Sequence, residues 1–372
     1  MVEAEVLSHR LYKLQSKLKA LSIDCAMIRT LSDYRYLLGL KWLRPAVLIP
    51  AEGVPTVFIA NGEEEGFSER CITKDLNVVT YFDGSDLMLK VTSAIKSLNA
   101  KKVGMVFSVE RDSYSLLYEL FRRANKNVEV VDIGPLIAEL RSLKDDYEIG
   151  KIRLAGNVAS EVLEKALNAV EEGVSETDIA AEAYYKAFKL GCEEPHIYVN
   201  SGPHPKVHSE PSKDIKIKSG VLVTIVVAAD RDGYYANTSA TTYVGSSRPE
   251  TLSNALRCAK DVYERAYELS RPGIKFIDVM KDLDEIYKRY GLLGHRLIGY
   301  THGVGLQPEE FPITTIVAAH RSKDIEERMV LAFVHSPLML PGYGSIKYED
   351  TFIVSDKGLE RVTKANDFLN QF

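Results

Sequence analysis

The chain lacks the short signals that identify several common functional classes. It contains no GxGxxG sequence and no phosphate-binding loop, so nothing in it indicates a dinucleotide or nucleotide site. No basic block stands out and the formal net charge is −5, which does not favour nucleic-acid binding. No apolar run approaches the roughly 18 residues that a membrane span needs. We therefore expect neither a nucleic-acid partner nor a membrane-embedded protein.

Cysteine is also scarce. The four cysteines (Cys25, Cys71, Cys192 and Cys258) are far apart and form no CxxC pair. This pattern favours reduced packing residues over a disulfide framework or a metal ligand set. Residues 1–21 are patterned as an amphipathic helix with early charges, which is not the pattern of a signal peptide. Together these features predict a cytoplasmic protein.

Carboxylates are scarce in the stretch VTIVVAADRDGYYANTSATTYVG, residues 223–245. An apolar run, a short polar turn and a second run rich in Tyr, Thr and Val predict a β-hairpin. Neither predicted strand carries a carboxylate. Asp230 and Asp232 lie in the turn beside Gly233, where Asp and Gly are typical turn residues. The hairpin therefore offers no acid to a catalytic site.

The remaining sequence predicts an α/β (α+β) protein of two domains. Residues 1 to about 135 alternate six short apolar strands with amphipathic helices, which is typical of an α/β domain. A charged joint then leads into a long amphipathic helix that we expect to begin near Lys144–Glu148. We place the N-terminal domain at residues 1–138 and the C-terminal domain at residues 139–372. The second domain contains the hairpin.

The motifs of the second domain carry a family resemblance. THGVGLQPEEFP at 301–312 resembles GHGxGLxxHExP, and KYEDT at 347–351 resembles RxEDT. In this order, the motifs are similar to those of the creatinase/prolidase/methionine-aminopeptidase superfamily, nearest to Xaa-Pro dipeptidases. The resemblance implies a creatinase-like N-terminal domain, a C-terminal pita-bread (M24-type) domain and a homodimer. It also implies two divalent metals held by Asp, Asp, His, Glu and Glu.

Most of those metal ligands are missing from this sequence. The five positions fall, in order, on Val226, Asn237, His302, either Val334 or His335, and Glu349. Only His302 and Glu349 keep the family's residue. Two adjacent divalent cations need several carboxylates to offset their mutual repulsion, and Glu349 is the one carboxylate left. We therefore expect no cofactor and a continuous buried strand around Val226.

Two alternatives remain open for the surviving ligand positions. His302, His335 and Glu349 could hold a single divalent metal (Zn, Mn or Co), with Asn237 or water as the fourth ligand. Alternatively, His302 and Glu349 hydrogen-bond each other in a partly buried pocket, because buried ionisable groups need a partner.

Three further residues are candidates for the site. His208 lies in a region that resembles one in creatinase, a metal-free member of the superfamily. The resemblance implies that a histidine in this region carries the proton during C–N bond cleavage, and imidazole suits that role. Glu310 is a candidate catalytic partner. Glu309 replaces the second His of the HExP motif and is either a pocket residue or a solvated loop charge.

Three functions therefore remain. The first is a pseudo-enzyme that binds a peptide, a protein or a small amide-like ligand in the cleft of the fold. The second is an active Xaa-Pro dipeptidase or aminopeptidase, supported by the fold and opposed by the ligand set. The third is a metal-free, creatinase-like C–N hydrolase that uses His208.

Overall fold

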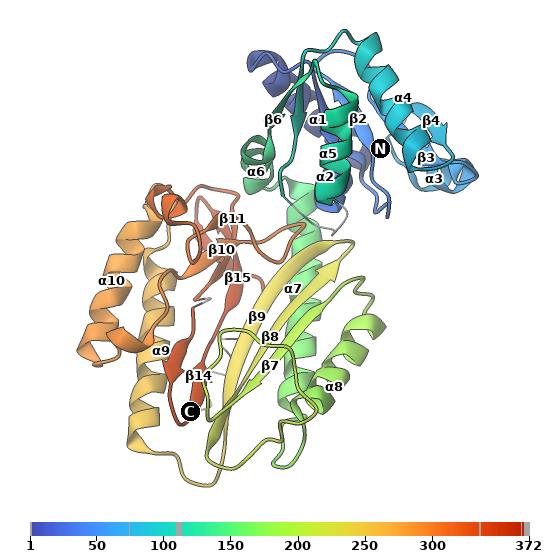
Figure 1. The fold of residues 1–372 in the computed structure, drawn as a ribbon. Helices are drawn as coiled ribbons and strands as arrows, with labels where there is room; N and C mark the ends of the chain where they lie inside the picture. Colours follow the sequence, from blue (N-terminus) through green and yellow to red (C-terminus); the bar gives the residue numbers. More distant parts are fainter. Residues whose placement is uncertain (1, 74, 109–113, 335, 366, 368–372) are drawn as a thin grey trace. The chain divides into compact units, whose positions relative to one another are not determined.

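The structure is a computed structural model that describes residues 2–73, 75–108, 114–334, 336–365 and 367. The chain forms two compact units, Met1–Arg141 and Ser142–Phe372 (Figure 1). The division predicted from the sequence falls after residue 138. Among the described helices, none is long and apolar enough to cross a membrane.

The first unit is built on a six-stranded mixed sheet with strand order β4-β3-β2-β1-β5-β6. Its elements are α1 (Val2–Ala20), β1 (Cys25–Ile28), α2 (Leu31–Leu38), β2 (Val47–Pro50), β3 (Thr56–Ala60), α3 (Glu64–Arg70), β4 (Asn77–Tyr81), α4 (Gly84–Ser97), β5 (Lys102–Met105), α5 (Tyr114–Ala124), β6 (Glu129–Asp132) and α6 (Gly134–Ser142). All six strands expected from the apolar runs are present. The short helices α2, α3 and α6 were not predicted.

A buried ion pair lies within this unit. Nη1 of Arg141 donates to Oδ1 of Asp33 at 2.7 Å and to the hydroxyl of Ser32 at 3.0 Å. Both charged side chains are less than one tenth exposed. The pair therefore connects α2 to the end of α6 through a contact that water does not screen.

Within its described residues, the second unit contains a three-stranded sheet, a five-stranded sheet and the two-stranded sheet β13-β14, and the two larger sheets pack against different helices (Figure 1). Its elements are α7 (Asp146–Leu167), α8 (Glu176–Lys189), β7 (His196–Ser201), β8 (Val221–Arg231), β9 (Tyr234–Val244), α9 (Glu250–Leu269), α10 (Phe276–Arg289), η1 (Leu293–His295), β10 (Thr301–Gly303), β11 (Glu310–Ile313), η2 (Ala318–Ser322), β12 (Val330–Phe333), β13 (Leu338–Leu340), β14 (Gly344–Ile346), β15 (Asp350–Ser355) and β16 (Gly358–Arg361). The sheet β7-β8-β9 packs against α7, and α8 packs on α7 and β7. The sheet β11-β10-β12-β15-β16 and α9, which packs on α10, form the other half.

The long helix α7 begins where the charged joint predicted it. The side chain of Asp145 accepts a hydrogen bond from the backbone of Glu148, and the Glu148 carboxylate accepts one from the backbone of Asp145. This capping box satisfies two amide groups that the first turn leaves without a helical partner. The start of α7 is therefore fixed by local sequence.

The predicted hairpin is present as β8 and β9, paired from Val221↔Val244 to Arg231↔Tyr234. Asp232 and Gly233 both have positive φ, at 51° and 77°, as a two-residue turn of the I′ type requires. The carboxylate of Asp230 accepts hydrogen bonds from the backbone N–H groups of residues 193 and 194 at 3.0 Å. Asp230 was predicted to lie in the turn, but it belongs to β8 and pairs with Tyr235, so the strand does carry one carboxylate. Its hydrogen bonds stabilise this end of the sheet.

Two glycines of the THGVGL motif allow β10 and β11 to approach closely. A Cβ atom at Gly303 would lie 2.3 Å from the carbonyl oxygen of Phe311, and one at Gly305 would lie 2.3 Å from the carboxylate of Glu310. Both distances are far below van der Waals contact. Gly303 is therefore required by the close approach of the β11 backbone, whereas a side chain at Gly305 would displace the Glu310 carboxylate.

Candidate functional site

One open cavity of about 350 Å³ lies in the second unit and collects most of the candidate residues. Its floor is one face of the β7-β8-β9 sheet and presents His196, Tyr198, Val226, Ala228 and Asn237. The other lining residues are His208, Gln307, Pro308, Glu309, Lys347 and Glu349. A concave site with a few converging polar groups is typical of small-ligand binding.

Strand register explains why these floor residues lie together. Tyr198 pairs with Val226, and His196 pairs with Ala228, which in turn pairs with Asn237. Residues directly opposite in adjacent strands point to the same face of a sheet. The register therefore forms two rows of side chains across the sheet, and both rows reach the cavity.

The two faces of β8 have different roles. Val223, Ile225 and Val227 belong to the hydrophobic core of the unit, whereas Val226 and Ala228 line the cavity. All three residues from Val226 to Ala228 are buried. The expected continuous buried strand is present, but Val226 itself lies on the cavity side, where the resemblance places a metal-binding aspartate.

Asn237 is held in place on three sides. Its backbone N–H donates to Oγ1 of Thr351 at 2.8 Å, that hydroxyl donates to the carbonyl of Asn237 at 2.8 Å, and Nδ2 donates to the carbonyl of Pro308 at 2.9 Å. Only 5% of the residue is exposed, and Oδ1 has no hydrogen-bond partner among the described residues. A buried acceptor without a partner costs free energy, so the site favours a donor at this point.

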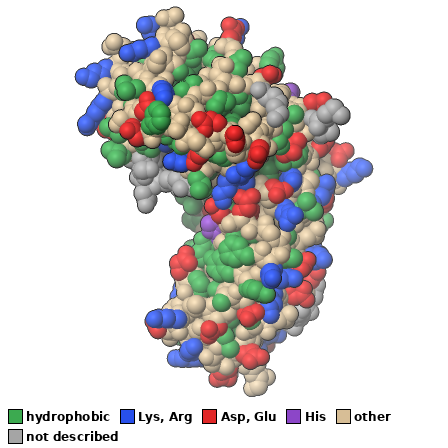
Figure 2. Space-filling view, turned by 90° about the vertical axis from the view of Figure 1, so that its right-hand side faces the viewer, with side chains coloured by type: hydrophobic (Ala, Val, Ile, Leu, Met, Phe, Trp, Pro, Cys, Tyr) green, Lys and Arg blue, Asp and Glu red, His purple; other side chains and the backbone are tan. Residues whose placement is uncertain are grey.

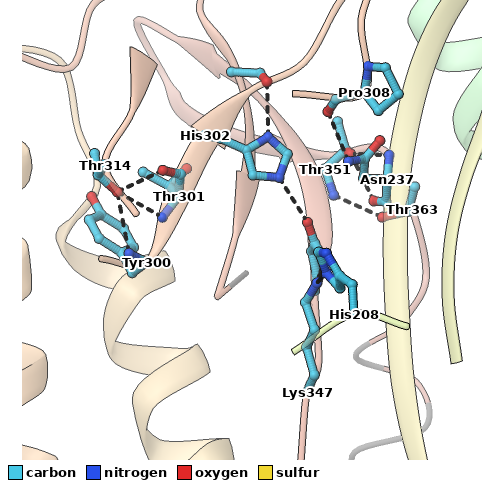
Figure 3. A network of polar contacts seen from close by, with 12 residues as sticks. His208, Asn237, Tyr300, Thr301, His302, Pro308, Thr314, Lys347, Thr351 and Thr363 are labelled. Atoms are coloured by element: carbon cyan, nitrogen blue, oxygen red, sulfur yellow. Dashed lines mark hydrogen bonds and ion pairs between the residues drawn. The ribbon is translucent and has the colours of Figure 1, made fainter. Parts of the chain in front are cut away.

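His302 and Glu349 are in contact, as one of the two open alternatives requires. Both side chains are completely buried, and Nε2 of His302 lies 3.3 Å from Oε1 of Glu349 (Figure 3). Nδ1 of His302 lies 2.9 Å from the carbonyl oxygen of Gly303. Burial by itself lowers the pKa of His302, but the hydrogen bond and negative charge of Glu349 outweigh burial, so the pKa is raised above 6.5.

The second oxygen of Glu349 faces an ammonium group. Nζ of Lys347 lies 2.7 Å from Oε2 of Glu349, and neither side chain is exposed to solvent. The same Nζ lies 3.0 Å from Nε2 of His208 (Figure 3). An ammonium group can only donate, so Nε2 of His208 accepts and the neutral ring carries its proton on Nδ1.

His208 is fixed by a second contact. Its ring stacks on that of Tyr198, with centroids 5.2 Å apart and planes inclined by 9°. Burial raises the pKa of the Tyr198 phenol, and the negative charges of Glu210 and Glu309 add to this effect. The structure thus places His208 in the cavity with a defined ring orientation.

The two glutamates that follow GVGL have different surroundings. Glu309 lines the cavity. Glu310 is instead buried, with its Oε1 2.9 Å from Nζ of Lys144, and it is not among the residues that line this cavity. A catalytic role for Glu310 therefore has no support from its position in this structure.

The fourth ligand position remains open. The side chain of Val334 packs in the hydrophobic core. His335 lies outside the described residues, so the single-metal set of His302, His335 and Glu349 is not described as a whole. Among the residues that the structure does describe, no group of three His, Cys, Asp or Glu side chains is placed to hold a metal ion.

The rest of the KYEDT motif has structural contacts. One oxygen of the Asp350 carboxylate accepts from the Tyr263 hydroxyl at 2.6 Å, and the other accepts from Thr363 at 2.5 Å and from the backbone of Ala365 at 2.7 Å. Burial and the adjacent Asp350 charge raise the pKa of Tyr263 far above 10. Asp350 therefore holds the C-terminal segment, while Glu349 faces the cavity.

Family comparisons agree with this architecture. Residues 150–356 match the model of metallopeptidase family M24, and residues 10–143 match that of the creatinase/prolidase N-terminal domain. The chain therefore belongs to family M24, in the creatinase/prolidase superfamily, with a C-terminal pita-bread domain.

Individual relatives narrow the position within the family. The Xaa-Pro dipeptidase of Pyrococcus furiosus is 26% identical over 362 residues, which cover 96% of this chain and 98% of the relative. A creatinase of a Bacillus species is 26% identical over 275 residues, which cover 69% of this chain and 66% of that creatinase. The crystal structure of the prolidase from Pyrococcus horikoshii superposes with a TM-score of 0.85 at 24% identity. The superposition covers 96% of this chain and 98% of the prolidase. The relatives thus place the chain near the Xaa-Pro dipeptidases.

Proposed function

We propose that this chain is a non-metallopeptidase member of the family that binds a peptide or a small amide-like ligand in the cavity of its pita-bread domain. The two hairpin positions that would supply metal-binding carboxylates are Val226 and Asn237. Glu349, the carboxylate that remains, is already neutralised by the Lys347 ammonium. These residues do not fit a pair of divalent cations, which need several uncompensated carboxylates.

The observation that carries ligand binding is Oδ1 of Asn237, for which the described part of the chain offers no hydrogen-bond partner. It is a buried acceptor at the wall of a preformed cavity. A ligand N–H group would satisfy it, and a peptide or other amide offers such a donor beside a carbonyl oxygen. The stacked rings of Tyr198 and His208 add an aromatic wall on which the apolar part of a ligand can pack.

A thermal-shift screen of dipeptides and small amides tests ligand binding. A ligand at 100 times its Kd stabilises the folded state by about 2.7 kcal/mol, which is easily measured. We expect Asn237→Ala to abolish the shift. The matched control is Asn254→Ala, because Asn254 also donates to a backbone carbonyl but does not line the cavity. Absence of any shift across the library would count against the proposal.

The alternative of an active Xaa-Pro dipeptidase is tested by metal content. The purified protein is incubated with Mn²⁺, Co²⁺ and Zn²⁺, freed of unbound ions by gel filtration, and analysed by mass spectrometry. We expect no stoichiometric metal and no hydrolysis of Xaa-Pro dipeptides. One or two ions per chain, accompanied by hydrolysis, would establish the dipeptidase instead. A single ion would point to the set His302, His335 and Glu349.

A second candidate is a metal-free C–N hydrolase, and the placement of His208 favours it. The ring lines the cavity, is held by Tyr198, and is hydrogen-bonded to Lys347. In that role His208 would move a proton between water and the leaving nitrogen, with Glu349 as a charged neighbour. Any metal-independent turnover should then disappear in His208→Ala, and unchanged turnover in that variant would remove the candidate.

Partners and location remain predictions. We propose a cytoplasmic homodimer, and size-exclusion chromatography with light scattering tests the dimer. We also propose that no nucleic acid binds. The formal charge of −5 supports this, and Figure 2 shows charged side chains of both signs on the visible faces of both units.

A further inference from the structure

We propose that Glu176 is a positioning residue of the cavity, because its buried carboxylate joins the two ends of the His208 loop (residues 202–211) and so holds His208 at the cavity wall. Glu176 is the first residue of α8, and its side chain is completely buried. It is not among the described residues that line the cavity, so it acts on the site through His208. The inference rests on the proposed function only in assigning His208 to the ligand site.

The two carboxylate oxygens of Glu176 bind opposite ends of the His208 loop. Oε1 accepts hydrogen bonds from the backbone N–H of Ser201 at 2.8 Å and from its hydroxyl at 2.7 Å. Oε2 accepts a hydrogen bond from the backbone N–H of Ser212 at 3.1 Å. Because Ser201 ends β7 and Ser212 directly follows the loop, one side chain fixes where the loop begins and where it ends.

Charge balance makes this arrangement specific. Nζ of Lys206, which lies in the loop, is 3.7 Å from Oε1 of Glu176. A buried carboxylate is stable only when donors or cations compensate its charge. Each of the donors that contact this carboxylate belongs to the His208 loop or to a residue that flanks it. Opening the loop would therefore leave a buried charge without compensation.

The position of Glu176 is itself fixed by the fold. Ser175 and Asp178 form the capping box of α8, which defines the first turn of the helix. The backbone N–H of Glu176 donates to the carbonyl of Ile215 at 3.2 Å. The carboxylate is thus presented from a rigid element, as a positioning residue requires.

The middle of the loop is held by β7. Oδ1 of Asn200 accepts a hydrogen bond from the Ser209 hydroxyl at 2.8 Å, and Nδ2 lies 3.5 Å from the carbonyl of Val207. Tyr198, two residues earlier on the same strand, stacks on the His208 ring. Alternate residues of a strand point to the same face, so β7 contacts the ring and both of its neighbours in sequence. Stacking therefore requires that the loop lies on β7.

Glu176→Gln tests the inference through the His208 ring itself. The substitution keeps the size of the side chain, removes its charge and replaces one acceptor by an NH₂ group. In NMR spectra the ring protons of His208, assigned by their absence in His208→Ala, should carry a ring-current shift from Tyr198. We expect this shift to be largely lost in Glu176→Gln, as it is in the unstacked reference Tyr198→Leu. Amide hydrogen exchange in the loop should become roughly tenfold faster or more.

Asp230→Asn is the matched control. Asp230 is also completely buried in the same unit, and its carboxylate also accepts hydrogen bonds from backbone N–H groups, those of residues 193, 194 and 233. Both variants should melt at a lower temperature than the wild type. Only Glu176→Gln should lose the ring-current shift. If Glu176→Gln is insoluble, Ser201→Ala is used, because it removes one hydrogen bond to the carboxylate and should reduce the shift in part.

Three results would overturn the inference: a wild-type His208 signal like that of Tyr198→Leu, an unchanged signal in Glu176→Gln, or an equal loss in Asp230→Asn. The thermal-shift screen tests the proposed function separately. Ligand binding with unchanged His208 signals in Glu176→Gln would remove the positioning role and leave the proposed function intact. Loss of stacking in Glu176→Gln without any ligand shift in the wild type would support the positioning role and count against the proposed function.

Discussion

Asn237 and Thr351 exchange two hydrogen bonds of 2.8 Å each, one accepted by the threonine hydroxyl and one donated by it. They join β9 of the hairpin to β15 of the second sheet at the edge of the candidate site. Because both residues are buried, water cannot replace either bond. The threonine of the KYEDT motif thus connects the two halves of the domain.

We expect Thr351→Val to lower the free energy of unfolding by about 1–3 kcal/mol, because it leaves a buried N–H and a buried carbonyl without partners. Thr351→Ser keeps the hydroxyl and should lose much less. Urea unfolding of the two variants measures the difference. Equal stability of Val and Ser at this position would mean that the hydroxyl does not join the sheets.

The two faces of β8 should respond differently to a carboxylate. Val226→Asp should bring no Mn²⁺- or Co²⁺-dependent Xaa-Pro hydrolysis, because one acid does not rebuild a ligand set that lacks the second aspartate. It should destabilise the protein, since the new charge is buried. Val227→Asp should destabilise it more, by several kcal/mol, because that side chain lies in the hydrophobic core rather than at a cavity that contains Lys347. Thermal unfolding ranks the two, and metal-dependent activity in Val226→Asp would contradict our account of the site.

The contribution of the capping box at the start of α7 can be measured by substitution. Asp145→Ala removes the capping box and should cost about 1 kcal/mol of stability. Asp146→Ala is the neighbouring control, because this exposed side chain pairs with Arg328 at the surface and its loss should change stability little. Chemical denaturation of both variants distinguishes the cap from a general effect of charge near the helix start.

The thiols should be slow to react in the folded protein. Burial raises the pKa of Cys25 and Cys258 to about 12 and that of Cys192 to about 11, from an ordinary value of 9.0. At pH 8 the reactive thiolate is therefore scarce. Iodoacetamide labelling followed by peptide mass spectrometry should modify the three residues slowly in the native protein and rapidly in urea. Rapid native labelling would show that they are accessible.

The raised thiol pKa values determine the direction in which the free energy of unfolding changes with pH. Above about pH 9 the unfolded thiols lose protons that the folded ones keep, so these residues make the free energy of unfolding fall as pH rises toward their folded values. Replacing Cys258 by Ala should make the alkaline decline less steep. Urea titrations at pH 8 and pH 10 measure it, and an unchanged slope between the two would contradict the assignment.

Much of the fold could be predicted because its signals are local. The apolar runs of the first unit, the Asp-Gly turn at 232–233 and the capping residues of α7 each determine structure within a few neighbouring residues. The family resemblance then fixed how these elements combine. The short helices α2, α3 and α6 were missed because so few residues give too little periodicity to separate them from loops.

The site was predicted less completely, because it depends on register and on long-range contacts. His208, Asn237, His302, Glu309 and Glu349 were singled out, and the structure brings four of them to the cavity wall, with His302 in contact with Glu349 behind it. Tyr198 and His196 were missed, since the pairing of β7 with β8 decides which face they occupy.

Lys347 was missed although a signal was present. It precedes Glu349 by two residues, and in an extended segment such residues point to the same side. A lysine beside a retained ligand position was therefore the available indication of an ion pair. Glu310 illustrates the opposite difficulty, because nothing near it in the sequence reveals its partner Lys144, which lies 166 residues away.

The alternation along β8 has a consequence for how such a protein can acquire or lose a chemistry. Packing against α7 is specified by one set of positions, and the character of the cavity by the set between them. Substitutions in the second set can therefore convert a catalyst into a receptor, or a receptor into a catalyst, while the chain continues to fold along the same route. Alternate positions of this one strand can therefore change almost independently, one set under the demands of packing and the other under those of the cavity.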